Sequence, residues 1–202
     1  DIYNRNLKEL IFSVFDTETT GLDPDGGDEI LSIAAVRIVN NQILRNDIFE
    51  ELVDPKRDIP LDSYKIHGIN YDMVEGKPDI ETVLPLFQIY SYDTVLVGHN
   101  IAFDMKMLKV KEKATQTRFS NPVIDTLLLS ALLHPVDKHH DMESIARRLG
   151  VNIIGRHTAL GDAIATAEIF LKLIPMLNAN GIFTLKNALE ASQKTYYARL
   201  KY

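Results

Sequence analysis

Three short segments with the apolar, β-branched and aromatic composition of buried strands fill most of the first 53 residues. They cover residues 10–16, 29–39 and 42–53. Asn40 and Asn41 separate the second segment from the third, and two consecutive Asn residues suit the tight turn of a β-hairpin. The sequence therefore predicts that the chain begins as an antiparallel meander, which restricts the fold to those built around a sheet with an antiparallel part.

The rest of the chain mixes loops and helices with one further strand. Pro and Gly punctuate residues 54–78, which we expect to form a loop with short helical turns. We expect a strand at 94–98. Helices are expected at 79–92 with a kink at Pro85, 101–113, 123–133, 158–174 and 184–202. Strands followed by mixed strands and helices indicate a single α/β domain over residues 1–202.

Several side chains refine these helices. Asp125 and Asp141 are placed to cap helices, and the second of these is expected to end near Gly150. Within 101–113, Phe103, Met107 and Val110 share one face at helical spacing. That face is expected to pack on the core.

Asp16 and Glu18 stand at the end of the first apolar strand. Side chains alternate along a strand, so both point to the same side. Like charges that close repel each other unless a cation sits between them. The same spacing occurs in three stretches that are expected to be loops or helix starts, where solvated charge is ordinary: Asp23/Asp25, Asp79/Glu81 and Asp141/Glu143. Only the Asp16 pair ends a buried strand.

An EF-hand calcium loop is one alternative for this stretch, with Asp16 and Glu18 at its first and third positions and Gly21 at its sixth. Such a loop needs a bidentate Glu at position twelve and a helix before it. Position twelve is Gly27, and the preceding residues are strand-like. The sequence therefore argues against this reading.

Two other stretches carry similar chemistry. Asp104 lies early in a helix that follows a strand. His157 directly precedes another helix, and Asp162 is expected on the second turn of that helix, so His157 and Asp162 can face one cleft. Each has an ordinary reading as a helix-dipole partner or a solvated charge. Together, four carboxylates and one His suit two divalent cations that clamp the attacking and leaving oxygens of a phosphodiester. A nearby His can take a proton from the attacking water.

The stretches DTETTG (16–21), HNIAFD (99–104) and HTALGD (157–162) resemble, in order and spacing, the three exonuclease motifs of the DEDDh branch of the DEDD 3′–5′ exonucleases. The chain looks similar to the proofreading epsilon subunit of bacterial DNA polymerase III and its relatives. KIHGI (65–69) and VIDTLLLSALL (123–133) also resemble family stretches. The resemblance runs from about residue 10 to 174, and the two ends of the chain carry none.

The resemblance implies a ribonuclease H-like α/β fold, with a mixed central sheet (an antiparallel meander plus parallel strands) flanked by helices. It also implies a metal-dependent 3′–5′ exonuclease that releases nucleoside 5′-monophosphates from single-stranded DNA ends, in proofreading or repair. Asp16, Glu18 and Asp162 would coordinate two Mg²⁺ or Mn²⁺ ions directly, and Asp16 would bridge them. Asp104 would hold one ion through a water, and His157 would be the general base.

The resemblance further assigns the substrate pocket. Thr19, Thr20 and Gly21 would meet the 3′-terminal sugar, and Leu22 would pack against the end base. The remaining pocket residues would be His99, Asn100 and Phe103, with His67 shaping the loop beside them.

Charge bears on how nucleic acid could bind. The formal net charge is −6, from 28 acidic and 22 basic residues. This argues against a protein that holds nucleic acid by bulk positive charge. The densest basic stretch either steers the substrate backbone or is a solvated helix face: Lys106, Lys109, Lys111, Lys113 and Arg118. His134, His139 and His140 flank a Pro-containing loop and are expected to be exposed.

The chain has no cysteine, and it shows no signal segment or apolar stretch of membrane-spanning length. We therefore expect a cytoplasmic protein without disulfides, thiolate metal sites or membrane contact. It begins with Asp1 rather than Met. We expect a piece of a longer chain that works with further domains or within a polymerase complex.

Two other functions stay open. An RNA 3′–5′ exonuclease of the RNase T or oligoribonuclease type would use the same catalytic residues, because metal ions contact only phosphate, and would differ in how the pocket treats the 2′-hydroxyl. A non-catalytic nucleic-acid-binding domain could keep the fold, although the intact acids and His157 argue against it.

Overall fold

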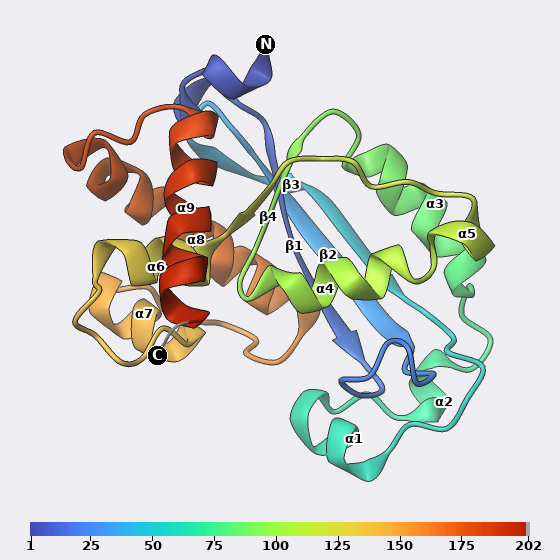
Figure 1. Ribbon diagram of the computed structural model, residues 1–202. Coiled ribbons are helices and arrows are strands. Elements are labelled where there is room, and N and C mark those ends of the chain that lie inside the picture. Colours follow the sequence, from blue (N-terminus) through green and yellow to red (C-terminus); the bar gives the residue numbers. More distant parts are fainter. Residues whose placement is uncertain (201–202) are drawn as a thin grey trace.

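A five-stranded mixed sheet forms the centre of the computed structural model, which describes residues 1–200 (Figure 1). The strand order is β3-β2-β1-β4-β5; β1, β2 and β3 are antiparallel neighbours, whereas β4 is parallel to both β1 and β5. The strands are β1 (Phe12–Thr19), β2 (Ile30–Val39), β3 (Gln42–Leu52), β4 (Val95–Gly98) and β5 (Val123–Asp125). The predicted α/β class and the antiparallel meander are confirmed.

Helices cover both faces of this sheet (Figure 1). Two short 3-10 helices precede it, η1 (Ile2–Asn4) and η2 (Leu7–Glu9). The α-helices are α1 (Leu61–His67), α2 (Tyr71–Val74), α3 (Ile80–Tyr90), α4 (Ile101–Lys109), α5 (Glu112–Thr115), α6 (Thr126–Leu133), α7 (Met142–Leu149), α8 (Ala159–Ala179) and α9 (Leu185–Leu200). No helix within residues 1–200 is both long and apolar enough to cross a membrane.

The predicted turn and caps are present. Asn40 and Asn41 join β2 to β3 with φ of 53° and 61°, a left-handed conformation that Asn tolerates better than most residues. The side chain of Asp125 accepts a hydrogen bond from the Leu127 amide, and that of Asp141 accepts one from the Ser144 amide. Both carboxylates therefore cap helices, as expected.

Three predicted boundaries are wrong by several residues. β1 continues to Thr19, so Asp16 and Glu18 lie inside the strand rather than at its end. Residues 123–125 form β5, and α6 starts only at Thr126. The helix expected over 101–113 ends at Lys109, and a separate α5 follows. Val110 therefore lies beyond the helical face that it was expected to share and is exposed.

The alternation of side chains along β1 separates two cores. Phe12 and Val14 belong to the core between the sheet and α6–α9, where the rings of Phe12 and Phe170 meet edge to face with centroids 4.8 Å apart. Phe15 belongs to the core between the sheet and α3–α5. By the same alternation, Asp16 and Glu18 project toward the α8 side and Thr17 projects toward the α4 side.

Candidate active site

Three carboxylates meet where β1 approaches the start of α8. Asp16 and Glu18 come from β1, and Asp162 comes from the first turn of α8, not the second turn that was predicted. One oxygen from each lies within 4.8 Å of the other two. Asp162 is buried, and Asp16 and Glu18 are partly buried. The alternation of β1 brings its two acids to the helix that supplies the third.

Asp104 approaches the site from the opposite face of the sheet. It lies in the first turn of α4 and is 5% exposed. Its Oδ1 accepts a hydrogen bond of 2.6 Å from the hydroxyl of Thr17, the residue between the two acids of β1. Asp104 therefore stands beside the three-carboxylate group and not within it.

Burial raises the pKa values of the site acids, and at Asp16 and Glu18 the neighbouring acids add to it. Burial, followed by the charges of Asp104, Glu18 and Asp162, raises the pKa of Asp16 well above its usual range. Burial and the charges of Asp162 and Asp104 raise the pKa of Glu18 to about 8. Burial raises the pKa of Asp104 to about 7, against the opposing hydrogen bond from Thr17. The site is thus short of positive charge.

This donor set fits divalent metal ions. Clustered carboxylate oxygens are the ligands that Mg²⁺ and Mn²⁺ prefer. A divalent cation placed among them would supply the charge whose lack raises the pKa values of Asp16 and Glu18. The residues present therefore suit the metal that the sequence motifs imply.

The loop before α8 fixes both oxygens of Asp162. Nη1 of Arg156 donates to Oδ2 at 2.6 Å, and the backbone N–H of His157 donates to Oδ1 at 3.2 Å. Burial raises the pKa of Asp162, while the charge of Arg156 opposes that rise. His157 itself has a φ of 67° and an exposed side chain, so its imidazole is open to solvent beside Asp162.

Internal hydrogen bonds shape the turn after β1. The hydroxyl of Thr19 donates to the carbonyl of Gly21 at 2.7 Å, and the hydroxyl of Thr20 donates to Asp28 at 2.8 Å. A Cβ at Gly21 would lie 2.4 Å from Oδ2 of Asp28, and because the Thr20 hydroxyl already holds that carboxylate in place, the close contact explains a glycine there. Leu22 is 84% exposed. The turn therefore holds an apolar side chain out in solvent next to the acids.

His67 supports this turn from α1. Its Nδ1 accepts a hydrogen bond from the Ile69 amide, so the proton is on Nε2, which donates to the carbonyl of Thr19 at 3.1 Å. Burial lowers the pKa of His67, which favours this neutral form. His67 therefore ties α1 to the backbone of the turn after β1.

The HNIAFD stretch joins β4 to α4. His99 lies 2.8 Å, through Nδ1, from the hydroxyl of Thr126 on α6, and burial lowers its pKa to about 4. Asn100 has a φ of 53°, donates its backbone N–H to Asp125 and exposes its side chain. Phe103 is half-buried against the α3–α5 core. Asn100 is thus the most open of the three.

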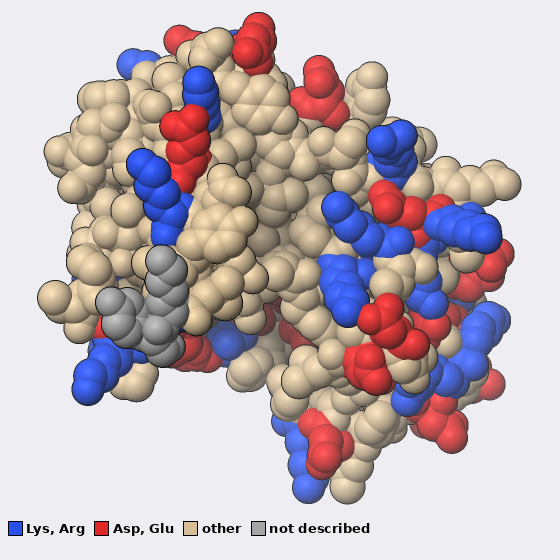
Figure 2. Space-filling view, in the orientation of Figure 1, with Lys and Arg blue, Asp and Glu red and all other residues tan. Residues whose placement is uncertain are grey.

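The basic stretch is not a free positive surface. Lys106 forms an ion pair of 2.7 Å with Asp25, and Lys111 forms one of 2.5 Å with Glu29. Figure 2 shows acidic and basic residues interspersed on the part of this face where α3–α5 lie. The two ion pairs tie α4 and the residues after it to the loop between β1 and β2.

The expectation that His134, His139 and His140 are all exposed is wrong for His134 and His140. His140 is 4% exposed and lies between the Ser130 hydroxyl at 2.7 Å and the Asp137 carbonyl at 2.9 Å. His134 is partly buried, and only His139 is exposed. His140 holds the loop between α6 and α7, which explains its burial.

Three residues at the site were missed by the sequence analysis: Thr17, Asp28 and Arg156. Thr17 and Arg156 are sequence neighbours of predicted site residues, which is the one signal that could have found them. Their partners Asp104 and Glu143 come from other helices. Only the fold shows what they contact.

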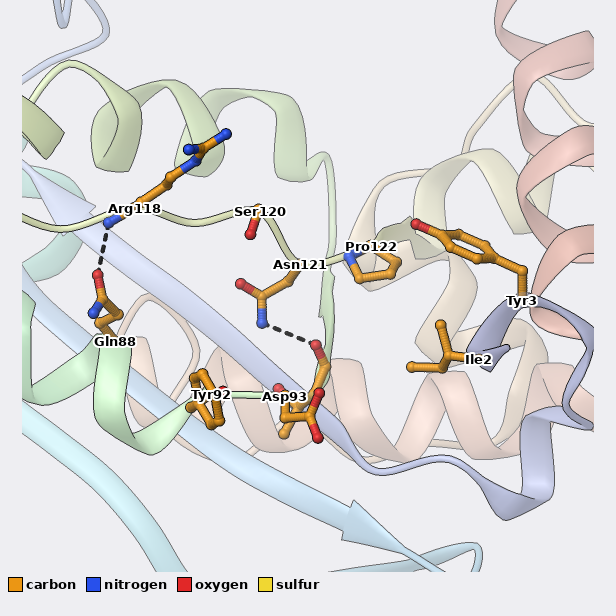
Figure 3. A pocket seen from close by; sticks show the side chains of 10 residues that line it. Ile2, Tyr3, Gln88, Tyr92, Asp93, Arg118, Ser120, Asn121 and Pro122 are labelled. Carbon is orange, nitrogen blue, oxygen red and sulfur yellow. Dashed lines mark hydrogen bonds between the residues drawn. The ribbon is translucent and has the colours of Figure 1, made fainter.

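A cavity of about 320 Å³ lies elsewhere, lined among others by Tyr3, Tyr92, Arg118 and Asn121 (Figure 3). Its residues include Thr94 and Pro122, which precede the parallel strands β4 and β5. It therefore sits at the amino ends of these strands, whereas the acids lie toward the carboxyl end of β1. It contains none of the candidate site residues.

Comparison with known proteins agrees with this geometry. Residues 13–170 match a family model described as Exonuclease, RNase_T. The chain belongs to this exonuclease family. The match includes all four acids and His157, so the predicted resemblance is confirmed.

The exonuclease also has close curated relatives. It is 47% identical over 190 residues to the DNA polymerase III subunit epsilon-like protein of Rhodobacter capsulatus, covering 93% of this chain and 27% of that protein. It is 42% identical over 173 residues to the PolC-type DNA polymerase III of Caldanaerobacter subterraneus, covering 85% and 12%. The chain thus spans about a quarter or less of these relatives' lengths.

Solved structures confirm the ribonuclease H-like fold. The exonuclease matches Exonuclease X in complex with 5′ overhanging duplex DNA with a TM-score of 0.71 and 28% identity, over 90% of this chain and 99% of that one. It matches E. coli Exonuclease I in complex with a dT13 oligonucleotide with a TM-score of 0.72 and 16% identity, over 85% and 42%. The second likeness concerns the fold alone.

Proposed function

We propose that this domain is a 3′–5′ exonuclease that hydrolyses single-stranded DNA from its 3′ end and releases nucleoside 5′-monophosphates. The observation that carries the proposal is the meeting of Asp16, Glu18 and Asp162 within 4.8 Å, with Asp104 and His157 beside them. The names of its relatives, an epsilon-like subunit of a DNA polymerase and an exonuclease bound to DNA, support DNA as the substrate.

Two divalent ions, Mg²⁺ or Mn²⁺, would be held directly by Asp16, Glu18 and Asp162 and through a water by Asp104. When bound, such ions polarise the phosphate and stabilise charge on the attacking and leaving oxygens. The protein's part is to hold the carboxylates ionised and in place. Thr17 does so for Asp104, and the backbone of His157 does so for Asp162.

His157 would move the proton. A ring nitrogen of its imidazole takes a proton from the attacking water, whose oxygen forms the new bond to phosphorus. The bond from phosphorus to the 3′ oxygen breaks, and that oxygen leaves with the shortened strand. Because His157 is exposed at the start of α8, it is open to both water and substrate.

The turn after β1 would receive the terminal nucleotide. Both Thr hydroxyls already donate within the protein, so backbone groups from Thr19 to Gly21 would face the sugar. Leu22 would lie against the end base, and Phe103 would offer an aromatic edge or face. His99, Asn100 and His67 would complete the pocket wall.

We also propose that the domain works as part of a larger assembly. The relatives are several times longer than the part that the chain matches, and two of them are named as DNA polymerase III proteins. The acidic net charge of −6 fits a domain that receives its strand from a partner.

A 5′-labelled oligonucleotide tests the proposal. With Mg²⁺ or Mn²⁺ it should shorten from the 3′ end, and a chelator should stop the reaction. Asp16→Asn and Asp162→Asn should each remove nearly all activity, because each deletes a charged ligand. Glu81→Gln, which removes an exposed acid from a pair with the same spacing, should leave the rate unchanged. Full activity in Asp162→Asn would refute the mechanism.

Cleavage rates of DNA and RNA oligonucleotides of the same sequence show which sugar the enzyme prefers. Faster cleavage of DNA is expected. Faster cleavage of RNA would overturn the assignment of the substrate while leaving the hydrolytic mechanism intact. Chelator-insensitive binding of either strand without cleavage would instead favour a non-catalytic domain.

A further inference from the structure

Arg156 bridges two acids at the edge of the site. Its Nε lies 2.5 Å from Oε1 of Glu143 on α7, and its Nη1 lies 2.6 Å from Oδ2 of Asp162 on α8. The side chain of Asp162 is 5% exposed, that of Arg156 is 30% exposed and that of Glu143 is 44% exposed. The guanidinium therefore reaches from a half-exposed anchor into the buried end of the acidic group.

The positive charge of Arg156 lowers the pKa values of three acids of the site. Arg156 opposes the rise in pKa that burial and the other acids cause at Asp16 and Glu18, and the rise that burial causes at Asp162. A planar guanidinium with several donors suits such a bridge, because it can satisfy two carboxylates at once. Arg156 thus does in part what a metal ion would do among these acids.

Arg156 and a bound metal ion would compete for the same ligand. Oδ2 of Asp162 accepts from Arg156, and Oδ1 accepts from the backbone of His157. A cation that takes Oδ2 must displace the guanidinium or share the oxygen at close range with a second positive charge, which is unfavourable. Glu143 would keep the displaced guanidinium beside the site.

We propose that Arg156 is the resident counter-cation of the acidic site, which holds Asp162 in the metal-free protein and yields it to an entering divalent cation. It is a positioning residue that stabilises the metal-free fold and weakens metal binding. This inference rests on the metal site proposed above.

Mn²⁺ binding measured by calorimetry tests it, together with the Tm of the metal-free and Mn²⁺-saturated proteins. Arg156→Gln should bind Mn²⁺ about tenfold more tightly, since a favourable close charge of this kind is worth about one pKa unit or more. Its metal-free Tm should fall, and the rise in Tm on adding Mn²⁺ should exceed that of the wild type. Arg156→Lys keeps the positive charge and should stay near the wild-type affinity.

Arg45→Gln is the matched control. Arg45 on β3 forms an ion pair of 2.8 Å with Glu168, which lies on α8 as Asp162 does. Arg45 and Glu168 line a separate groove between β3 and α8 that contains none of the site acids. Loss of Arg45 should leave Mn²⁺ affinity unchanged. If Arg156→Gln does not fold without metal, Glu143→Gln tests the proposal through the opposite change in Mn²⁺ affinity. Without Glu143, the guanidinium of Arg156 should bind Asp162 more strongly, and Mn²⁺ should therefore bind more weakly.

The outcomes separate the two proposals. Wild-type protein that binds no Mn²⁺, or binds it equally well in Asp16→Asn, refutes the metal site and this inference with it. Normal wild-type binding with unchanged or weaker binding in Arg156→Gln overturns the inference alone. The same holds if Arg156→Lys behaves like Arg156→Gln, because the effect would then come from geometry and not from charge.

Discussion

Single residues of the acidic site carry opposing demands, and Glu18 shows them most clearly. Its carboxylate must be ionised to bind metal, yet burial and neighbouring acids raise its pKa from 4.5 to about 8. A raised pKa means that the folded state binds the proton more tightly than the unfolded state does. The stabilisation from protonated Glu18 is present in full below the unfolded value of 4.5 and is lost as pH rises through about 8.

The metal-free protein should therefore lose stability relative to Glu18→Gln as pH rises from about 5 to about 9. The variant has no group to titrate at that position, so its Tm should fall less over the same range. Thermal unfolding in the presence of a chelator measures both curves. Adding Mg²⁺ should reduce the difference, since a bound cation pairs with the ionised form. Parallel curves without metal would show that Glu18 is not perturbed.

Residues also differ in how far their place could be predicted. Asp16 and Glu18 were expected on one face of a strand, and the family resemblance implied that Asp162 joins them as a metal ligand; the structure brings all three together. The hydrogen bond from Thr17 to Asp104 spans 87 positions, so no local pattern shows it. The catalytic and binding roles assigned to these residues remain predictions.

At the scale of elements, the close approach of the 154–156 loop to α8 positions Arg156 and His157. A Cβ at Gly161 would lie 2.1 Å from the carbonyl oxygen of Gly155 and 2.5 Å from that of Ile154. Both are backbone atoms and cannot rotate away. Gly161, in the first turn of α8, is therefore required for the loop to rest on the helix.

Gly161→Ala should move this loop away from α8. Overpacking of this kind costs about 1–3 kcal/mol, and the shift should disturb Arg156 and His157. A lower Tm and a large loss of nuclease activity are expected from unfolding and cleavage assays. Gly26→Ala is the contrast, because its Cβ would meet only the carboxylate of Asp23, which can rotate. A wild-type rate in Gly161→Ala would show that the loop position does not matter.

Helices and strands could be predicted from the sequence where their hydrophobic pattern extends over many residues. The β2–β3 hairpin has ten and eleven residues in its strands and two Asn at its turn. β5 has three residues, too few for a period, and becomes a strand by pairing in parallel with β4. Tertiary contact, not local propensity, makes it one.

On the scale of the whole molecule, the N-terminal segment lies against the residues that lead into α9, at the end of the sheet away from the acids (Figure 1). The Leu7 amide donates to the carbonyl of Phe183 at 2.9 Å, and the Leu185 amide donates to that of Arg5 at 3.1 Å. Leu7 and Leu185 are fully buried in the core against α8. The N-terminal segment and the start of α9, which carry no family motif, thus complete the same core that supports α8.

A substitution in this core, far from the acids, should therefore change the stability of the protein without changing its affinity for metal. Leu185→Ala removes a fully buried side chain and should lower the free energy of unfolding by about 2–5 kcal/mol. Its affinity for Mn²⁺ should not change while the protein stays folded, because the hydrogen bonds and the ion pair that position Asp104 and Asp162 involve Thr17, Arg156 and His157 and not α9. Leu200→Ala, 64% exposed on the same helix, should alter stability by about 0.5 kcal/mol or less. Urea unfolding measures the stability, and Mn²⁺ calorimetry measures the affinity independently. A loss of Mn²⁺ affinity in folded Leu185→Ala would mean that the core around Leu7 and Leu185 also positions Asp162 through α8.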